Sequence, residues 1–153
     1  MVVASDYVST DAWQHVTLRY DNGHCDLTMF TNGTKQGEKI TRTDAEVVDW
    51  GTTNRTLLNF GLGFDGSNHY QGLIDEVRVY HRPLTDAEID DYVSQAGLLR
   101  QNYQRMLSAQ YDMNYPVKGD PNLRDHSYYG NHGTLVGDPT FVESHTDYIR
   151  FLI

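Results

Sequence analysis

Three short segments of the chain gather side chains that could do chemistry. The first, residues 64–70 with the sequence FDGSNHY, combines a carboxylate, an amide, an imidazole and an aromatic ring. Such a set could bind sugar hydroxyls, or a calcium ion together with a sugar. The candidate ligand-binding residues are Asp65, Asn68, His69 and Tyr70. Because Asp, Asn, Gly and Ser are also ordinary turn residues, a simple hairpin connection is the alternative.

The second candidate is Asp75, which lies in an apolar run from Leu73 to Tyr80. The alternation of that run predicts a strand in which Asp75 shares a face with two valines. A carboxylate among apolar side chains needs backbone N–H groups, a hydroxyl or a cation as its partner. Asp75 is therefore a structural hydrogen-bond anchor or a calcium ligand. Glu76 and Arg78, on the opposite face, are expected to be solvated neighbours.

The third segment, residues 125–131, has the sequence DHSYYGN. Calcium takes about six to eight oxygen ligands, and the oxygens of Asp125 and Asn131 in a glycine loop are of that kind. The same residues also suit an ordinary turn. None of the seven histidines falls in a zinc-binding motif, so zinc is not expected.

No arrangement of residues predicts catalysis. A glycoside hydrolase needs two carboxylates that flank the scissile bond. Asp75 and Glu76 are adjacent in the predicted strand and point to opposite faces, while Asp90 and Asp91 lie on a predicted helix. The sequence has no phosphate-binding glycine loop and no nucleophile elbow. We therefore predict that the protein is not an enzyme.

The composition limits the partners of this protein. The 153 residues include 12 Lys and Arg against 21 Asp and Glu, which gives a net charge of −9. This acidic balance argues against nucleic acid as a partner, because such binding relies on Lys and Arg. No apolar run approaches the roughly 18 residues of a membrane helix, so membrane insertion is not expected. The single cysteine, Cys25, excludes an internal disulfide.

The elements that position these segments are mostly strands, as the aromatic content of 12% suggests. Asn-Gly turns at Asn22 and Asn32 predict hairpins between short strands. A capping box from Thr85 to Glu88 predicts a helix that ends near Gly97. Further predicted strands lie at residues 15–20, 27–30, 39–41, 135–136, 141–142 and 148–153.

Three motifs together resemble the laminin-G-like, concanavalin A-like jelly-roll modules. They are WQHVTLRYD at residues 13–21 with LTMFTNG at 27–33, YQGLIDEVRVYHRPLTDAEI at 70–89, and DHSYYGNHGTL at 125–135. In the third motif, Tyr128 stands where the family pattern has a small residue. The resemblance implies an all-β fold, a jelly-roll β-sandwich, with one short helix and a connector that is strand or helix.

The motifs occur in an unusual order, because the family's closing motif precedes its opening motif. We predict that residues 1–97 form the C-terminal part of a sandwich and that 98–110 form a connector, although residues 106–113 could be a strand. Residues 111–153 would be opening strands that complete the same sheet or a neighbour's. The chain is accordingly a fragment of a tandem array, a permuted domain or a strand-exchanging subunit.

The resemblance implies a non-catalytic, lectin-like recognition module for glycans or surface proteins. Residues 64–70 and 125–133 would make the contacts, and Asp75, Asp125 and Asn131 would bind a structural calcium. The alternative is a structural subunit of an extracellular filament, virion or tail fibre. That subunit would self-associate through Tyr148–Ile153, an apolar strand that would aggregate if left unpaired. Both hypotheses place the protein outside the cell, at a cell surface or on a virion surface.

Overall fold

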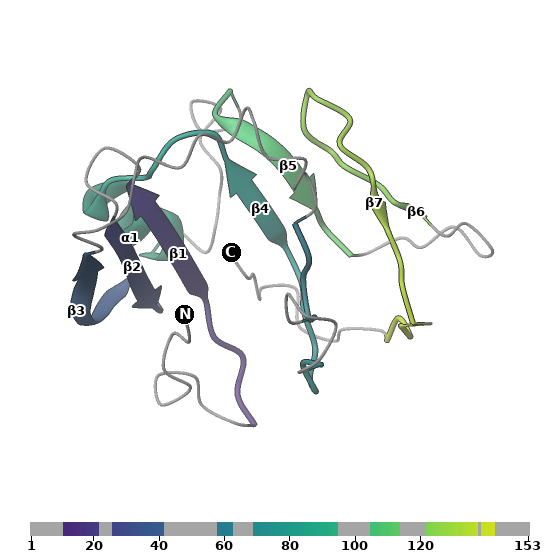
Figure 1. Ribbon diagram of the computed structural model, residues 1–153, viewed down its shortest axis with the longest axis horizontal. Coiled ribbons are helices and arrows are strands. Elements are labelled where there is room, and N and C mark those ends of the chain that lie inside the picture. The colour runs from purple at the N-terminus through teal and green to yellow at the C-terminus, as the bar shows by residue number, and fades with distance from the viewer. Residues whose placement is uncertain are drawn as a thin grey trace.

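The structure is a computed structural model that describes residues 11–21, 26–41, 58–62, 69–94, 105–113, 122–137 and 139–142. Its elements are β1 (Val16–Asp21), β2 (Asp26–Thr31), β3 (Thr34–Thr41), β4 (Val77–Tyr80), α1 (Asp86–Ser94), β5 (Leu107–Tyr111), β6 (Asn122–Leu123) and β7 (Gly133–Thr134). Figure 1 shows β4 and β5 between the β1–β3 sheet on one side and β6–β7 on the other. The described part is mostly sheet with one helix, as the all-β prediction requires.

The strands β1, β2 and β3 form an antiparallel sheet in that order. The turn between β2 and β3 is the predicted Asn-Gly turn, with positive φ at Asn32 (49°) and Gly33 (79°). Positive φ at both central residues gives the type I′ twist that hairpins favour. The other predicted turn, at Asn22, lies outside the described residues.

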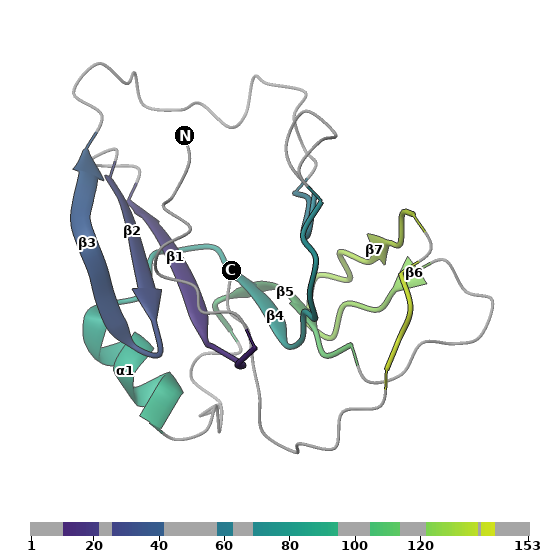
Figure 2. The ribbon, with the colours of Figure 1, turned by 90° about the horizontal axis from the view of Figure 1, so that it is seen from below.

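In β1, the polar face is better buried than the apolar one. Thr17 is 3% exposed, whereas Leu18 is 37% exposed. The reason is the helix α1, which lies against this sheet in Figure 2. The His15 ring, at the start of β1, packs 5.2 Å from the Tyr92 ring of α1. Which face of β1 is buried is therefore decided by the packing of α1 and not by the alternation of polar and apolar residues along the strand.

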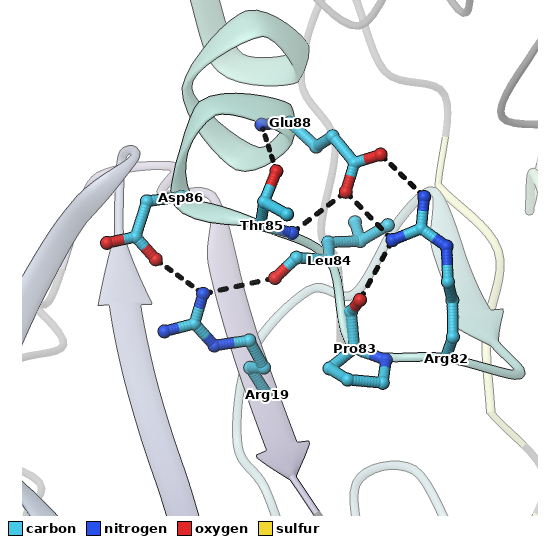
Figure 3. A network of polar contacts seen from close by, with 7 residues as sticks. All are labelled: Arg19, Arg82, Pro83, Leu84, Thr85, Asp86 and Glu88. Carbon is cyan, nitrogen blue, oxygen red and sulfur yellow. Dashed lines mark hydrogen bonds and ion pairs between the residues drawn. The ribbon is translucent and has the colours of Figure 1, made fainter.

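The helix α1 begins with the predicted capping box (Figure 3). The backbone N–H of Glu88 donates to Thr85 Oγ1 at 3.2 Å, and the N–H of Thr85 donates to Glu88 Oε2 at 2.8 Å. The Arg82 guanidinium donates to both oxygens of the Glu88 carboxylate, from Nη2 to Oε1 at 2.5 Å and from Nη1 to Oε2 at 2.9 Å. The hydrogen bonds from Arg82 and from Thr85 lower the pKa of Glu88 to about 2, although burial acts in the opposite direction.

Arg19 of β1 connects the sheet to the start of the helix (Figure 3). Its Nη1 donates to the Leu84 carbonyl at 3.0 Å and also contacts the Asp86 carboxylate. Beneath this contact, Ile89 of α1 packs against Phe30 of β2, each 1% exposed. The apolar cluster and the ion pair together fix α1 on the sheet.

The second sheet pairs β4 with β5 in antiparallel register, from Val77 opposite Tyr111 to Tyr80 opposite Leu107. Residues 107–110, expected as the end of a connector, are therefore strand, which is the alternative that the sequence left open. The pairing joins the closing motif to the strand before the opening motif within one chain. The three explanations of the motif order stay predictions.

The strand β4 is shorter than the predicted Leu73–Tyr80, since it begins only at Val77. Glu76 has a φ of +51°, which interrupts the extended backbone just before it. The expectation that Glu76 and Arg78 are solvated neighbours is wrong. Arg78 is 3% exposed, its Nη2 lies 2.6 Å from Glu76 Oε2, and its guanidinium lies 5.2 Å from the Tyr92 ring centre. The helix covers that face of β4.

The third pair, β6 with β7, matches Asn122 to Thr134 and Leu123 to Gly133. The strand ends there, so the predicted strands at residues 135–136 and 141–142 are wrong. Gly137, with a φ of +80°, turns the backbone directly after the first of these. The predicted last strand, Tyr148–Ile153, lies outside the described residues.

Candidate functional site

The best-defined polar arrangement in the described chain is built around Asp125, whose side chain is buried. Its Oδ1 accepts the backbone N–H groups of Gln110 at 2.8 Å and Ser127 at 2.7 Å. Its Oδ2 accepts the Ser127 hydroxyl and the Asn131 N–H, both at 2.7 Å. A carboxylate offers about four acceptor positions, so these four donors fill them.

A second set of contacts ties the same loop to β5. The Asn131 side-chain amide donates to the Ser108 carbonyl at 2.8 Å, and the Tyr111 hydroxyl donates to the Asn131 carbonyl at 2.5 Å. On the far side, the Asp125 N–H donates to His132 Nδ1 at 3.0 Å. Residues 125–132 are therefore held against β5 by side chains at both ends of the loop.

These contacts also set the charge of the carboxylate. Burial raises the pKa of Asp125, but the hydrogen bonds from Ser127 and from the backbone of Gln110 and Asn131 outweigh it. The pKa of Asp125 consequently lies below its ordinary value, and the group is ionised at neutral pH. Its negative charge and burial both raise the pKa of the Tyr111 phenol, with burial the larger cause.

A pocket of about 660 Å³ opens beside this loop. Its walls are Arg105, Leu107 and Gln110 on one side and the four residues His126–Tyr129 on the other. Tyr128 is fully exposed and Tyr129 is 63% exposed. The Asp125 contacts thus hold a short loop that presents two aromatic rings beside a polar wall.

The oxygen set at Asp125 does not fit a calcium ion as it stands. All of its acceptor positions receive N–H or O–H donors, and Asn131 takes part as a donor through both its backbone and its side chain. Within the described ranges, no group of three or more His, Cys, Asp or Glu residues could hold a metal. The predicted calcium at Asp75, Asp125 and Asn131 stays a prediction.

Asp75 lies in the bend that precedes β4. Its Oδ1 accepts the backbone N–H of Glu76 at 2.8 Å, at the residue whose φ is positive. This contact is the kind that the anchor explanation of Asp75 requires. It supports the turn that sets the start of β4.

The loop at residues 64–70 is described only at its end. Asp65 and Asn68 lie outside the described residues, while His69 and Tyr70 are exposed. The Tyr70 N–H donates to the Gly61 carbonyl at 2.9 Å, which closes the loop. Neither His69 nor Tyr70 is among the residues that line the pocket beside β5.

Sequence reasoning found one wall of the pocket and missed the other, because residues 126–129 lie in the 125–133 loop that was predicted to make the contacts. Tyr128 and Tyr129 stand next to each other in a glycine loop, and this pair was the available signal. Arg105 and Gln110 gave no signal, because they lie in the stretch expected to be a connector. The hydrogen bonds from Gln110 to Asp125 and from Asn131 to Ser108 are what hold the loop beside β5, and they join residues 15 or more positions apart.

The comparisons with known proteins bear on the first part of the chain. The family model Laminin_G_3, described as the concanavalin A-like lectin/glucanases superfamily, matches residues 2–90, more than half of the sequence. The chain belongs to this superfamily. No curated protein and no solved structure matches it. The matched residues include strands β1–β4 of this chain and end within α1, so the described lining of the pocket lies beyond them.

Membership in the concanavalin A-like superfamily indicates a carbohydrate- or protein-binding module. Laminin-G-like domains are generally non-catalytic and typically extracellular. In the described part of this chain, no helix is both long and apolar enough to cross a membrane.

Proposed function

We propose that this chain is a non-catalytic recognition module that binds a glycan in the pocket beside β5. The observation that carries the proposal is the pocket of about 660 Å³, with Tyr128 and Tyr129 on one wall. Binding sites of this kind combine aromatic surfaces with a few polar groups that fix orientation. Extracellular glycans are the partner, and the protein acts outside the cell.

The wall chemistry suits a sugar. A pyranose ring presents C–H groups on its faces and hydroxyls around its edge. The exposed tyrosine rings offer flat apolar surface with a polar tip. The side chains of Gln110 and Arg105 supply hydrogen-bonding groups across the pocket. A sugar could therefore stack and hydrogen-bond at the same time.

The loop that carries the tyrosines is organised before a ligand arrives. The Ser127 side chain, which precedes the two rings, donates to Asp125 at 2.7 Å, and Asn131 beyond them is bonded to Ser108. A preorganised loop loses less conformational entropy on binding. This supports recognition from the 126–129 loop rather than from a loop that must first fold.

The absence of catalysis is part of the proposal. Glu76 is committed to the buried Arg78 at 2.6 Å, and the four acceptor positions of Asp125 are filled. Hydrolysis of a glycoside needs one carboxyl group free to give a proton and another that faces the sugar. Neither of these acids is available for those roles.

Binding of the purified chain to a glycan array, followed by titration calorimetry on each hit, tests the proposal. Tyr129→Ala and Tyr128→Ala should each weaken binding by at least about tenfold, because an aromatic stacking surface is lost. Tyr70→Ala is the matched control, since Tyr70 is an exposed tyrosine outside the pocket.

Two results would contradict the proposal. If no glycan binds, the recognition is of another kind. If Tyr70→Ala abolishes binding while Tyr128→Ala and Tyr129→Ala do not, the site is the 64–70 loop. The assembly alternative depends on Tyr148–Ile153, outside the described residues, and stays a prediction that light scattering of a chain truncated at residue 147 would test.

A further inference from the structure

The described lining of the pocket contains one Arg and no acidic side chain, although the chain as a whole is acidic. The protein carries a net charge of −9, yet no Asp or Glu is among the described residues that line the pocket. Arg105 contributes a guanidinium with five N–H donors. The ligand therefore meets a local positive site in an acidic protein.

The hydrogen-bonding groups of the walls favour a ligand rich in acceptors. Arg105 can only donate, and the Gln110 amide and the tyrosine hydroxyls can donate as well as accept. The Ser127 hydroxyl is already engaged by Asp125 and by the Ser108 carbonyl. A neutral sugar offers many hydroxyl donors, which carboxylates usually accept, and the described residues of the lining supply no carboxylate.

His126 does not change this balance. Its Nε2 lies 3.4 Å from the carboxylate of Asp112, which directly follows β5. Among the described residues that line the pocket, Arg105 is the one Lys or Arg side chain.

We infer that the glycan bound in this pocket carries an anionic group, either a carboxylate or a sulfate ester, and that Arg105 binds this group. The inference rests on the proposed function and specifies its ligand class. A guanidinium matches both groups, because each presents two oxygens in a plane and charge-assisted hydrogen bonds to them are strong. The tyrosine rings would pack against the sugar that bears this group.

The net negative charge of the protein limits the number of anionic groups that the ligand can carry. Outside the pocket, the excess of acidic residues opposes the approach of an extended polyanion. At physiological salt, charges interact over about 8 Å, so a single acidic sugar at Arg105 escapes most of that repulsion. The recognised unit is therefore one acidic residue in a mostly neutral oligosaccharide.

Matched probes test this inference. Neutral N-acetyllactosamine is compared with its sialylated and 6-sulfated forms, and xylotriose with its glucuronic acid-substituted form. Heparin serves as the polyanion. We expect at least one acidic probe to bind about tenfold more tightly than its neutral parent, as one charge-assisted hydrogen bond would give. Whether carboxylate or sulfate is preferred identifies the group.

Two variants make the outcome specific. Arg105→Gln should bring the acidic probe to the affinity of its neutral parent, and Arg105→Lys should retain part of the preference. Tyr129→Ala should weaken both. If neutral and acidic probes bind equally, the inference is wrong while the proposed function stands. Tighter binding of heparin than of the single acidic sugars would also overturn it, and failure of every glycan would overturn both.

Discussion

The carboxylate of Asp125 accepts the backbone N–H of Gln110 at 2.8 Å, which joins a loop to strand β5, 15 residues earlier. This bond bridges the two walls of the pocket, since Gln110 lies on one wall and the loop after Asp125 forms the other. One buried acid therefore sets the width of the candidate binding site. It is also the residue whose removal should have the largest structural effect on that site.

Asp125→Ala should destabilise the protein by about 2 to 4 kcal/mol, because it leaves several buried N–H and O–H donors without an acceptor. Asp125→Asn should cost less, since one oxygen remains. Urea denaturation followed by tyrosine fluorescence measures the change. Asp112→Asn, at a more exposed carboxylate nearby, is the control, and an equal loss there would contradict the role of Asp125.

Glu88 should make the stability depend on pH in strong acid. Hydrogen bonds from Arg82 lower its pKa from 4.5 in the unfolded chain to about 2 in the folded protein. The stabilisation is therefore complete above about pH 4.5 and is lost as the pH falls towards 2. Because the group is partly exposed, we expect only about 1 kcal/mol.

Glu88→Gln tests that dependence in denaturation curves collected from pH 5 down to 2. The variant should be less stable than the parent at pH 5, and the difference should shrink towards pH 2. A difference that does not change with pH would show that the carboxylate acts through packing alone. Thr85→Ala, which removes the other half of the capping box, should cost about 1 kcal/mol at pH 5.

His15 should make the protein sensitive to milder acid. Burial, together with the charge of Arg78, lowers its pKa from 6.5 to about 4. Between these values the unfolded chain binds a proton that the folded protein does not, so stability falls as the pH drops from about 6.5 to 4. The total loss is on the order of 3 kcal/mol.

His15→Phe retains a ring against Tyr92 and removes the titrating group. Its stability should vary much less than the parent's between pH 6.5 and 4, as thermal melts would show. His69→Gln replaces an exposed histidine and is the control. If both variants keep the parental pH profile, another group is responsible.

Calcium should not alter the stability of the described site. The acceptor positions of Asp125 are filled, so a bound ion would first have to displace those donors. We expect the same melting temperature in millimolar calcium and in chelator. A ligand that binds only the folded state must raise that temperature, so a clear increase with calcium would revive the predicted metal site.

The sequence by itself determined the features that depend on neighbours along the chain. The Asn32-Gly33 turn follows from two residues that tolerate positive φ, and the start of α1 follows from the reciprocal bonds of Thr85 and Glu88. The superfamily was likewise readable from short motifs. Each of these requires only residues within a few positions of one another.

Only the tertiary structure decided which faces are buried and where the pocket lies. Alternation along β1 and β4 could not reveal that α1 would cover Thr17 and Arg78, because the helix comes from a different part of the chain. The pocket depends on Gln110 and Asp125 meeting across the β5 edge. Such long-range contacts are fixed by packing and by the pairing of β4 with β5, and no local pattern encodes them.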